Sequence, residues 1–180
     1  MSPLQIERTQ SSETVFDGRL IDVRRDTVRL PNGMTAEREI VVHPNVIGVV
    51  PELPDGRIVL VRQFRKSAER ILLEIPAGGI DEGETPEQAV AREMAEETGY
   101  RVGSVESLGS FYTSPGYSTE FMYLFTATDL ESGPPTEDTD EIEVVELPLA
   151  DALSRLPDRE MADAKTQIAL LLYARRQESR

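Results

Sequence analysis

Alternating apolar and polar positions dominate this chain, and the pattern predicts strands along most of its length. The apolar runs are bounded by turn sequences such as Pro31-Asn32-Gly33 and Pro54-Asp55-Gly56. The strands that we expect are residues 20–30, 39–42, 46–50, 58–63, 71–75, 102–112, 121–127 and 142–147. Residues 1–13 are mostly polar, and we expect them to be loosely held.

A second spacing, with apolar residues three and four positions apart, predicts helices. Residues 163–176 carry a packing stripe of Ile168, Leu171 and Leu172, and residues 149–156 read as a shorter helix. A third helix lies in the middle of the chain, between the predicted strands. Strands with helices before and after them favour an α/β fold in which helices cover both faces of a sheet.

The middle helix is predicted from both of its ends. Thr85 is suited to the N-cap, Pro86 to the first helical position, and Gln88 to the reciprocal position of a capping box. Gly99 can adopt the left-handed conformation that ends a helix. The helix should therefore span residues 86–98.

The two faces of this helix differ in chemistry. Val90, Ala91, Met94 and Ala95 form an apolar stripe that should face the core. Three carboxylates, those of Glu93, Glu96 and Glu97, fall on the other side, where we expect them to point outward together.

Carboxylates at this spacing repel one another by roughly 0.2–0.5 kcal/mol per pair. A divalent cation would offset the repulsion, and hard oxygen ligands suit Mg²⁺ or Mn²⁺. Three glycines within residues 78–83 let the backbone approach a ligand closely. The alternative is a solvated acidic face, which is common in a chain with 33 acidic and 19 basic residues.

Composition narrows the classes of function. A chain of 180 residues is long enough to bury a real core. The net charge of −14 argues against nucleic acid or an anionic membrane as a partner, because both require a positive surface. The absence of cysteine excludes disulfides and thiolate chemistry. Without an apolar run of membrane-spanning length or a signal peptide, we expect a cytoplasmic protein.

The string from Gly78 to Tyr100 fills every fixed position of a known motif, the Nudix box: Gly78, Glu84, Arg92-Glu93, Glu96-Glu97 and Gly99. The chain therefore resembles the Nudix hydrolases, which cleave nucleoside diphosphates linked to another moiety. This resemblance implies an α/β/α sandwich with a mixed sheet over residues 46–180. It also implies a β-rich N-terminal segment, residues 1–45, which we expect to form a homodimer.

Further residues resemble the ADP-ribose pyrophosphatase branch of the family. Pro115 lies sixteen residues after Gly99, the spacing that marks this branch, and Gly116 follows it. The resemblance places Glu120 near the distal ribose of a substrate. A Pro-Gly pair by itself would indicate only a turn.

Within the same resemblance, Arg62 is the expected contact to the pyrophosphate, because an arginine fork matches phosphate oxygens. The main-chain carbonyl of Ala77 is an expected metal ligand beside the three helix carboxylates. Arg65 could equally be a surface residue.

The N-terminal segment is expected to contribute to substrate binding. In similar enzymes such segments cross between subunits and build the adenosine pocket. The resemblance therefore implies that Phe16, Arg38 and Glu39 contact the substrate. Phe16 would stack on the base or belong to the core, and the sequence leaves both possibilities open. We interpret the single histidine, His43, as structural.

The acidic loop at residues 136–142 is the expected source of the general base. In related enzymes a loop here often carries the glutamate that activates water. Our choice is Glu141, with Glu137, Asp138 and Asp140 as alternatives, and a solvated loop remains a competing interpretation for each. Within the box, Glu96 and Glu97 are expected to serve catalysis through the metal.

These observations predict an Mg²⁺-dependent hydrolase of a nucleoside diphosphate sugar. The expected substrate is ADP-ribose, with AMP and ribose 5-phosphate as products. The alternatives are a related enzyme for another sugar nucleotide, such as GDP-mannose, and a non-catalytic ADP-ribose sensor. Three repelling glutamates argue against a pure sensor, which has no need of them.

Overall fold

A computed structural model of the chain describes residues 6–133, 141–156 and 158–179. The chain divides into two compact units. The first contains the residues up to Asn45 together with Tyr112–Phe121, and the second contains Val46–Phe111 and the residues from Met122 onward. Among the described residues, none of the helices has both the length and the apolar composition needed to cross a bilayer.

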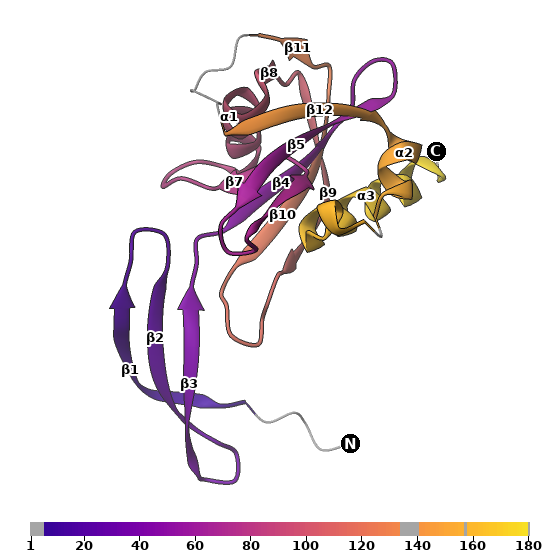
Figure 1. The fold of residues 1–180 in the computed structure, drawn as a ribbon. Helices are drawn as coiled ribbons and strands as arrows, with labels where there is room; N and C mark the ends of the chain where they lie inside the picture. Colours follow the sequence, from indigo (N-terminus) through magenta and orange to yellow (C-terminus); the bar gives the residue numbers. More distant parts are fainter. Residues whose placement is uncertain (1–5, 134–140, 157, 180) are drawn as a thin grey trace. The chain divides into compact units, whose positions relative to one another are not determined.

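The first unit is built on three antiparallel strands, β1 (Arg8–Asp17), β2 (Asp22–Arg29) and β3 (Thr35–Val42), in the order β1-β2-β3 (Figure 1). The expectation that residues 1–13 are loosely held is wrong for residues 8–13, which belong to strand β1. All ten residues of β1 are exposed, so no face of it carries an apolar pattern. The strand is held instead by its backbone ladder to β2 and by a hydrogen bond of 2.6 Å from Ser12 to Asp26.

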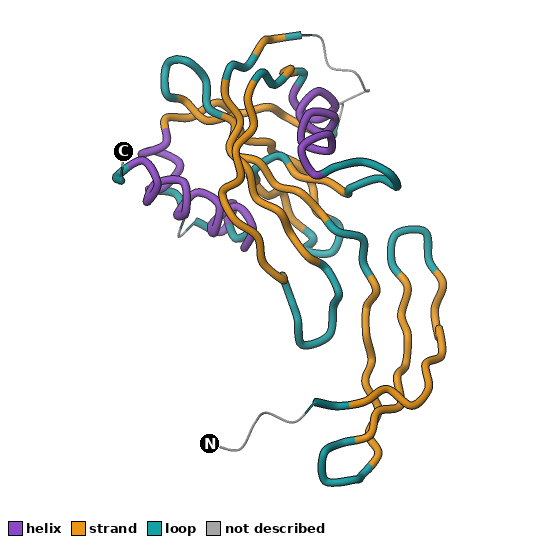
Figure 2. The backbone as a smooth tube through the Cα atoms, turned by 180° about the vertical axis from the view of Figure 1, so that it is seen from behind, coloured by secondary structure: helices purple, strands orange, loops and turns teal. Residues whose placement is uncertain are grey.

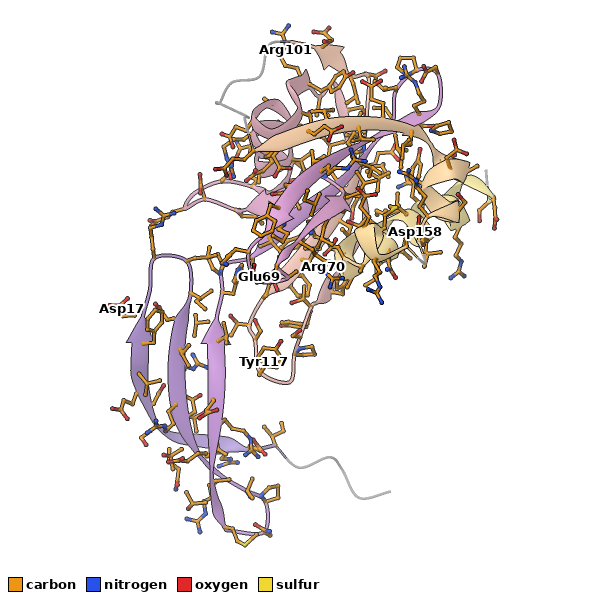
Figure 3. All side chains as sticks on the ribbon, viewed as in Figure 1. Asp17, Glu69, Arg70, Arg101, Tyr117 and Asp158 are labelled. Atoms are coloured by element: carbon orange, nitrogen blue, oxygen red, sulfur yellow. The ribbon has the colours of Figure 1, made fainter. Side chains whose placement is uncertain are left out.

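A loop from much later in the chain completes this unit. The N–H of Val41 in β3 donates to the carbonyl of Tyr117 at 2.8 Å, and the N–H of Thr119 donates to the carbonyl of Val41 at 3.0 Å. The rings of Tyr112 and Phe121 pack edge to face at the two ends of the loop, with centroids 4.8 Å apart. Tyr117 is labelled on this loop in Figure 3.

The second unit contains two main sheets. One has the order β7-β4-β10-β9, formed by β7 (Ala77–Gly79), β4 (Val46–Pro51), β10 (Phe121–Thr128) and β9 (Ser104–Tyr112). It is mixed, because β4 runs parallel to β10 and antiparallel to β7. The other has the order β12-β5-β6, formed by β12 (Ile142–Pro148), β5 (Arg57–Arg65) and β6 (Arg70–Glu74). A short pair joins β8 (Tyr100–Arg101) to β11 (Glu131–Ser132).

Helices cover both faces of the sheet that contains β4. Side chains at Val46 and Val50 join a core with α2 (Leu149–Ser154), the 3₁₀ helix η1 (Arg159–Met161) and α3 (Ala164–Gln177). The alternate residues Ile47 and Val49 join a second core with α1 (Pro86–Thr98). Figures 1 and 2 show α1 and α3 on opposite sides of these strands. The expected α/β/α sandwich is confirmed.

Helix α1 begins and ends where its caps predict. The Thr85 side chain and Gln88 form the reciprocal capping box, and Gly99 adopts φ 73° at the C-terminal end. The predicted apolar stripe is only partly right. Ala91 is exposed, whereas Ala89 and Thr98 are buried beside Val90 and Met94. The buried face of α1 therefore includes Ala89 in place of the predicted Ala91.

Candidate active site

The turn before α1 is shaped by close approach of backbone and side chain. Strand β7 pairs with β4 and carries Gly78 opposite Ile47. A Cβ atom on Gly78 would overlap the carboxylate of Glu93, so a side chain at this position would have to displace that carboxylate. The neighbouring Gly79 has open space around the same position. The first glycine of the box therefore lets the carboxylate of Glu93 lie directly against the backbone.

Arg92 joins the turn to the helix. Its guanidinium donates to Glu84 at 3.0 and 3.1 Å and to the carbonyl of Gly79 at 2.7 Å. It also donates to Glu93 at 2.7 Å and to Glu96 at 3.1 Å. Arg92 therefore forms ion pairs with Glu84, Glu93 and Glu96. The hydrogen bonds from Arg92 lower the pKa of Glu84 below its ordinary value.

The three helix carboxylates do not all point outward, as the helical spacing suggested. Only 13% of the Glu93 side chain is exposed, and Glu97 is also partly buried. Glu96 is more open, and Arg92 holds it. The expectation of a common outward face is wrong because the β6–β7 connection covers the last turn of the helix, where the N–H of Ala77 donates to Oε2 of Glu97 at 3.1 Å.

Burial changes the acidity of two of these groups. It raises the pKa of Glu97 to about 7, and the charge of Glu93 adds to the effect, although the hydrogen bond from Ala77 opposes both. Burial likewise raises the pKa of Glu93, against the pull of Arg92. A bound cation would favour the ionised form of both carboxylates.

This arrangement fits a divalent metal ion. Partly buried carboxylates and a main-chain carbonyl are hard oxygen ligands of the kind that Mg²⁺ and Mn²⁺ bind. Within the described ranges, no three acidic, histidine or cysteine side chains converge closely enough to hold an ion alone. The guanidinium of Arg92 pairs with Glu93 and Glu96 in this arrangement.

Arg62 and Glu141 line one pocket of about 270 Å³ in the second unit. Arg62 donates to Glu143 at 2.8 Å and to Glu160 at 2.7 Å, so its fork already faces two carboxylates. Phe64 and Ile71, a cross-strand pair between β5 and β6, form the apolar part of the wall. The alternative bases Glu137, Asp138 and Asp140 lie outside the described residues.

Another pocket, of about 520 Å³, lies wholly within the first unit. It brings together four of the residues predicted to contact substrate: Arg38, Glu39, Pro115 and Gly116. Its wall also contains Arg24, Tyr112 and Tyr117, none of which the sequence indicated.

Phe16 and Glu120, which were also predicted to contact the substrate, are not part of the wall of this pocket. Phe16 is 56% exposed on β1, so the possibility that it belongs to the core is wrong. Glu120 accepts a hydrogen bond of 2.5 Å from the hydroxyl of Thr113. His43 bonds through its ring to the carbonyl of Pro44 at 2.7 Å, a local contact that agrees with a structural role.

Comparison with known proteins identifies the family. The NUDIX domain matches residues 42–171, and the nucleoside diphosphate sugar hydrolase N-terminal domain matches residues 7–41. The chain belongs to the Nudix family. It is a Nudix pyrophosphohydrolase, and enzymes of this family generally use divalent metal ions.

Three individual similarities extend over nearly the whole chain. An ADP-ribose pyrophosphatase of Bacillus subtilis (strain 168) is 42% identical over 91% of this chain and 90% of its own length. A methanol dehydrogenase activator of Bacillus methanolicus is 39% identical over 94% of each. The crystal structure of an ADP compounds hydrolase superposes with a TM-score of 0.89, at 26% identity, over 99% of this chain and 98% of the other.

One group of this Nudix enzyme was missed by sequence reasoning. Glu74, at the end of β6, is 1% exposed and binds both Arg65 and Lys165. An acid in the otherwise apolar run 71–75 was the available signal for Glu74. Arg65, left open as a surface residue, is half-buried in this pair, and nothing in the sequence indicated Lys165, 91 residues from Glu74.

Proposed function

We propose that this enzyme hydrolyses the pyrophosphate bond of ADP-ribose, giving AMP and ribose 5-phosphate. The observation that carries the proposal is the pair of partly buried carboxylates, Glu93 and Glu97, beside the main chain of Ala77. The membership of the Nudix family and the similarity to an ADP-ribose pyrophosphatase support the choice of substrate.

We propose Mg²⁺ as the ion, with Mn²⁺ as an effective substitute. Glu93, Glu97 and the carbonyl of Ala77 would hold it. Glu96 would also bind the ion after its ion pair with Arg92 is broken. Such an ion neutralises pyrophosphate charge and lowers the pKa of bound water. Because the chain carries a net charge of −14, that neutralisation also lets a doubly charged substrate approach.

The protein's own groups would orient the substrate and move the proton. Arg62 is the proposed contact to the pyrophosphate. The phosphate oxygens would replace the carboxylate of Glu143 or Glu160 as acceptors of hydrogen bonds from the Arg62 guanidinium. Glu141, which lines the same pocket, is the proposed base that takes a proton from the attacking water. The water then bonds to phosphorus as the oxygen that bridges the two phosphates leaves.

Specificity for the nucleoside and the sugar is assigned to the first unit. Arg38, Glu39, Pro115 and Gly116, which share a pocket, are the proposed contacts, together with Phe16 and Glu120. Arginine and carboxylate side chains can hydrogen-bond hydroxyl and amine groups, and exposed Phe16 can stack on a base. We propose that residues 1–45 form the interface of a homodimer and that the enzyme is cytoplasmic.

A panel of nucleoside diphosphate sugars tests the function. ADP-ribose, GDP-mannose and related compounds are incubated with Mg²⁺, and products are identified by chromatography. We expect the highest kcat/KM for ADP-ribose, with AMP and ribose 5-phosphate in equal amounts. A clear preference for GDP-mannose would assign the alternative substrate, and tight binding of ADP-ribose without turnover would indicate a sensor.

A further inference from the structure

The most deeply buried carboxylate of the described chain lies outside the Nudix box. Glu74 is 1% exposed and accepts hydrogen bonds from Nε and Nη2 of Arg65 at 2.9 and 2.8 Å. Nζ of Lys165 donates to the same carboxylate. Burying a charge is costly unless it is paired and hydrogen-bonded, and here two cations supply both. Burial alone would raise the pKa of Glu74, yet Arg65 and Lys165 hold it below its ordinary value.

This cluster joins the ends of three elements. Arg65 is the last residue of β5, Glu74 is the last residue of β6, and Lys165 lies in the first turn of α3. A second contact involves the residues that directly follow Glu74 and Lys165. The buried hydroxyl of Thr166 accepts a hydrogen bond of 3.0 Å from the N–H of Ile75. The N-terminal end of α3 is thus tied to the two residues that precede Pro76.

The chain leads directly from this junction to the candidate metal site. Ala77 follows Glu74 by three residues, and its N–H donates to Glu97. The carbonyl of the intervening Pro76 accepts from the N–H of Val49 at 3.0 Å, so the connection is also held against β4.

We propose that Glu74 is a positioning residue of the metal site. By holding Arg65 and Lys165 it fixes the ends of β5, β6 and α3 together, and so sets the place of the Ala77 main chain relative to Glu97. The inference rests on the proposed function, since it takes Ala77 and Glu97 as metal ligands. A positioning role differs from simple stabilisation in one measurable way. A variant that folds but has a loosened junction should bind the metal ion more weakly.

The test measures Mn²⁺ binding to the substrate-free protein, by following the electron paramagnetic resonance signal of free Mn²⁺. We expect Glu74→Gln to raise the Kd for Mn²⁺ by about tenfold and to lower kcat more than it changes KM. Glu74→Asp should also weaken binding, because the shorter side chain keeps the charge but does not reach both cations. Lys165→Met, which leaves the fork to Arg65 in place, should raise the Kd by about threefold.

Glu106→Gln is the matched control. Glu106 pairs with Arg176 near the other end of α3, so its loss loosens the same helix away from Glu74. We expect its Mn²⁺ affinity to equal that of the wild type, even if the metal-free Tm falls as far as it does in the Glu74 variants. An equal loss of affinity in the control would mean that general loosening of α3 is responsible, and the inference would be overturned.

Other outcomes are equally decisive. Wild-type affinity in Glu74→Asp, with a loss in Glu74→Gln, would show that charge alone matters and would overturn positioning. If Glu74→Gln does not fold, unchanged affinity in Lys165→Met and Glu74→Asp overturns the inference. Wild-type protein that binds Mn²⁺ no better than Glu97→Gln would instead overturn the proposed metal site, and this inference with it.

Discussion

The main-chain N–H of Ala77 donates to Oε2 of Glu97 over 3.1 Å, joining the turn before α1 to the last turn of the helix. This bond favours the ionised carboxylate, but burial is the larger effect and raises the pKa of Glu97 to about 7. The metal-free site therefore titrates near neutrality. A cation therefore has to compete with a proton for the carboxylate of Glu97. The hydrogen bond from Ala77 holds that carboxylate in place.

The metal-free enzyme should lose stability as pH rises from about 5 to 7.5. Between its ordinary value of 4.5 and its folded pKa of about 7, Glu97 binds more protons in the native than in the unfolded state. Stability is then highest at the acidic end of this window and falls as Glu97 ionises. Glu93, whose pKa is also raised, acts in the same direction.

Thermal unfolding at pH 5 and pH 7.5, in the presence of a chelator, measures this effect. Relative to the wild type, Glu97→Gln should gain on the order of 1–2 kcal/mol between these two pH values, because a neutral amide does not titrate. Parallel curves for the two proteins would show that Glu97 has an ordinary pKa.

Glu97→Gln should also remove nearly all activity while the protein stays folded. The amide has the shape of the carboxylate but lacks the charge that a divalent ion requires. Mg²⁺ should raise the Tm of the wild type, because it binds only the native state, and it should raise that of the variant less. A variant with wild-type turnover would show that the metal-site assignment is wrong.

How much could be predicted from the sequence depended on the range of each interaction. The caps at Thr85 and Gly99 involve neighbouring residues, and both ends of α1 were predicted correctly. The buried face of the helix depends on what packs against it, and there Ala91 was placed wrongly. Strand β1 has no buried face, so no periodicity could reveal it.

The candidate site shows the same limit. The motif selected Glu93 and Glu97 by residue type and spacing, and the resemblance to the ADP-ribose pyrophosphatase branch selected Arg62. The partners of Arg62, namely Glu143 and Glu160, are 81 and 98 residues away, and only the fold brings them to its guanidinium. The burial that raises the pKa of Glu97 likewise comes from tertiary packing.

Gly78→Ala should reduce kcat/KM at least tenfold with a smaller effect on stability. The new methyl group would meet the carboxylate of Glu93, the mobile end of a side chain, so Glu93 moves rather than the backbone. Gly79→Ala is the matched control, since open space surrounds that position and the same pair of residue types is exchanged. Equal kinetics for the two variants would exclude a special role for the contact between Gly78 and Glu93.

Phe16→Ala should raise KM several-fold and leave Tm nearly unchanged, because the ring is exposed and buries little apolar area. Val15→Ala, at the adjacent exposed position on β1, provides the control. Steady-state kinetics and sedimentation of both variants separate loss of substrate contact from loss of self-association. An unchanged KM for Phe16→Ala in a protein of unchanged oligomeric state would remove Phe16 from the proposed substrate contacts.

Glu141→Gln should lower kcat by about 10²–10⁴-fold, the usual contribution of a positioned base. KM and Mg²⁺ affinity should change little, because the carboxylate would act chiefly in the transition state. Glu143→Gln is the control from the same pocket, and its pairing with Arg62 predicts a smaller effect on kcat. If Glu137, Asp138 or Asp140 proves to be the sensitive position instead, the loop keeps the role and the choice of Glu141 is wrong. If all these variants keep most of their activity, the base is to be sought among the box glutamates, and Glu96 is the first to test.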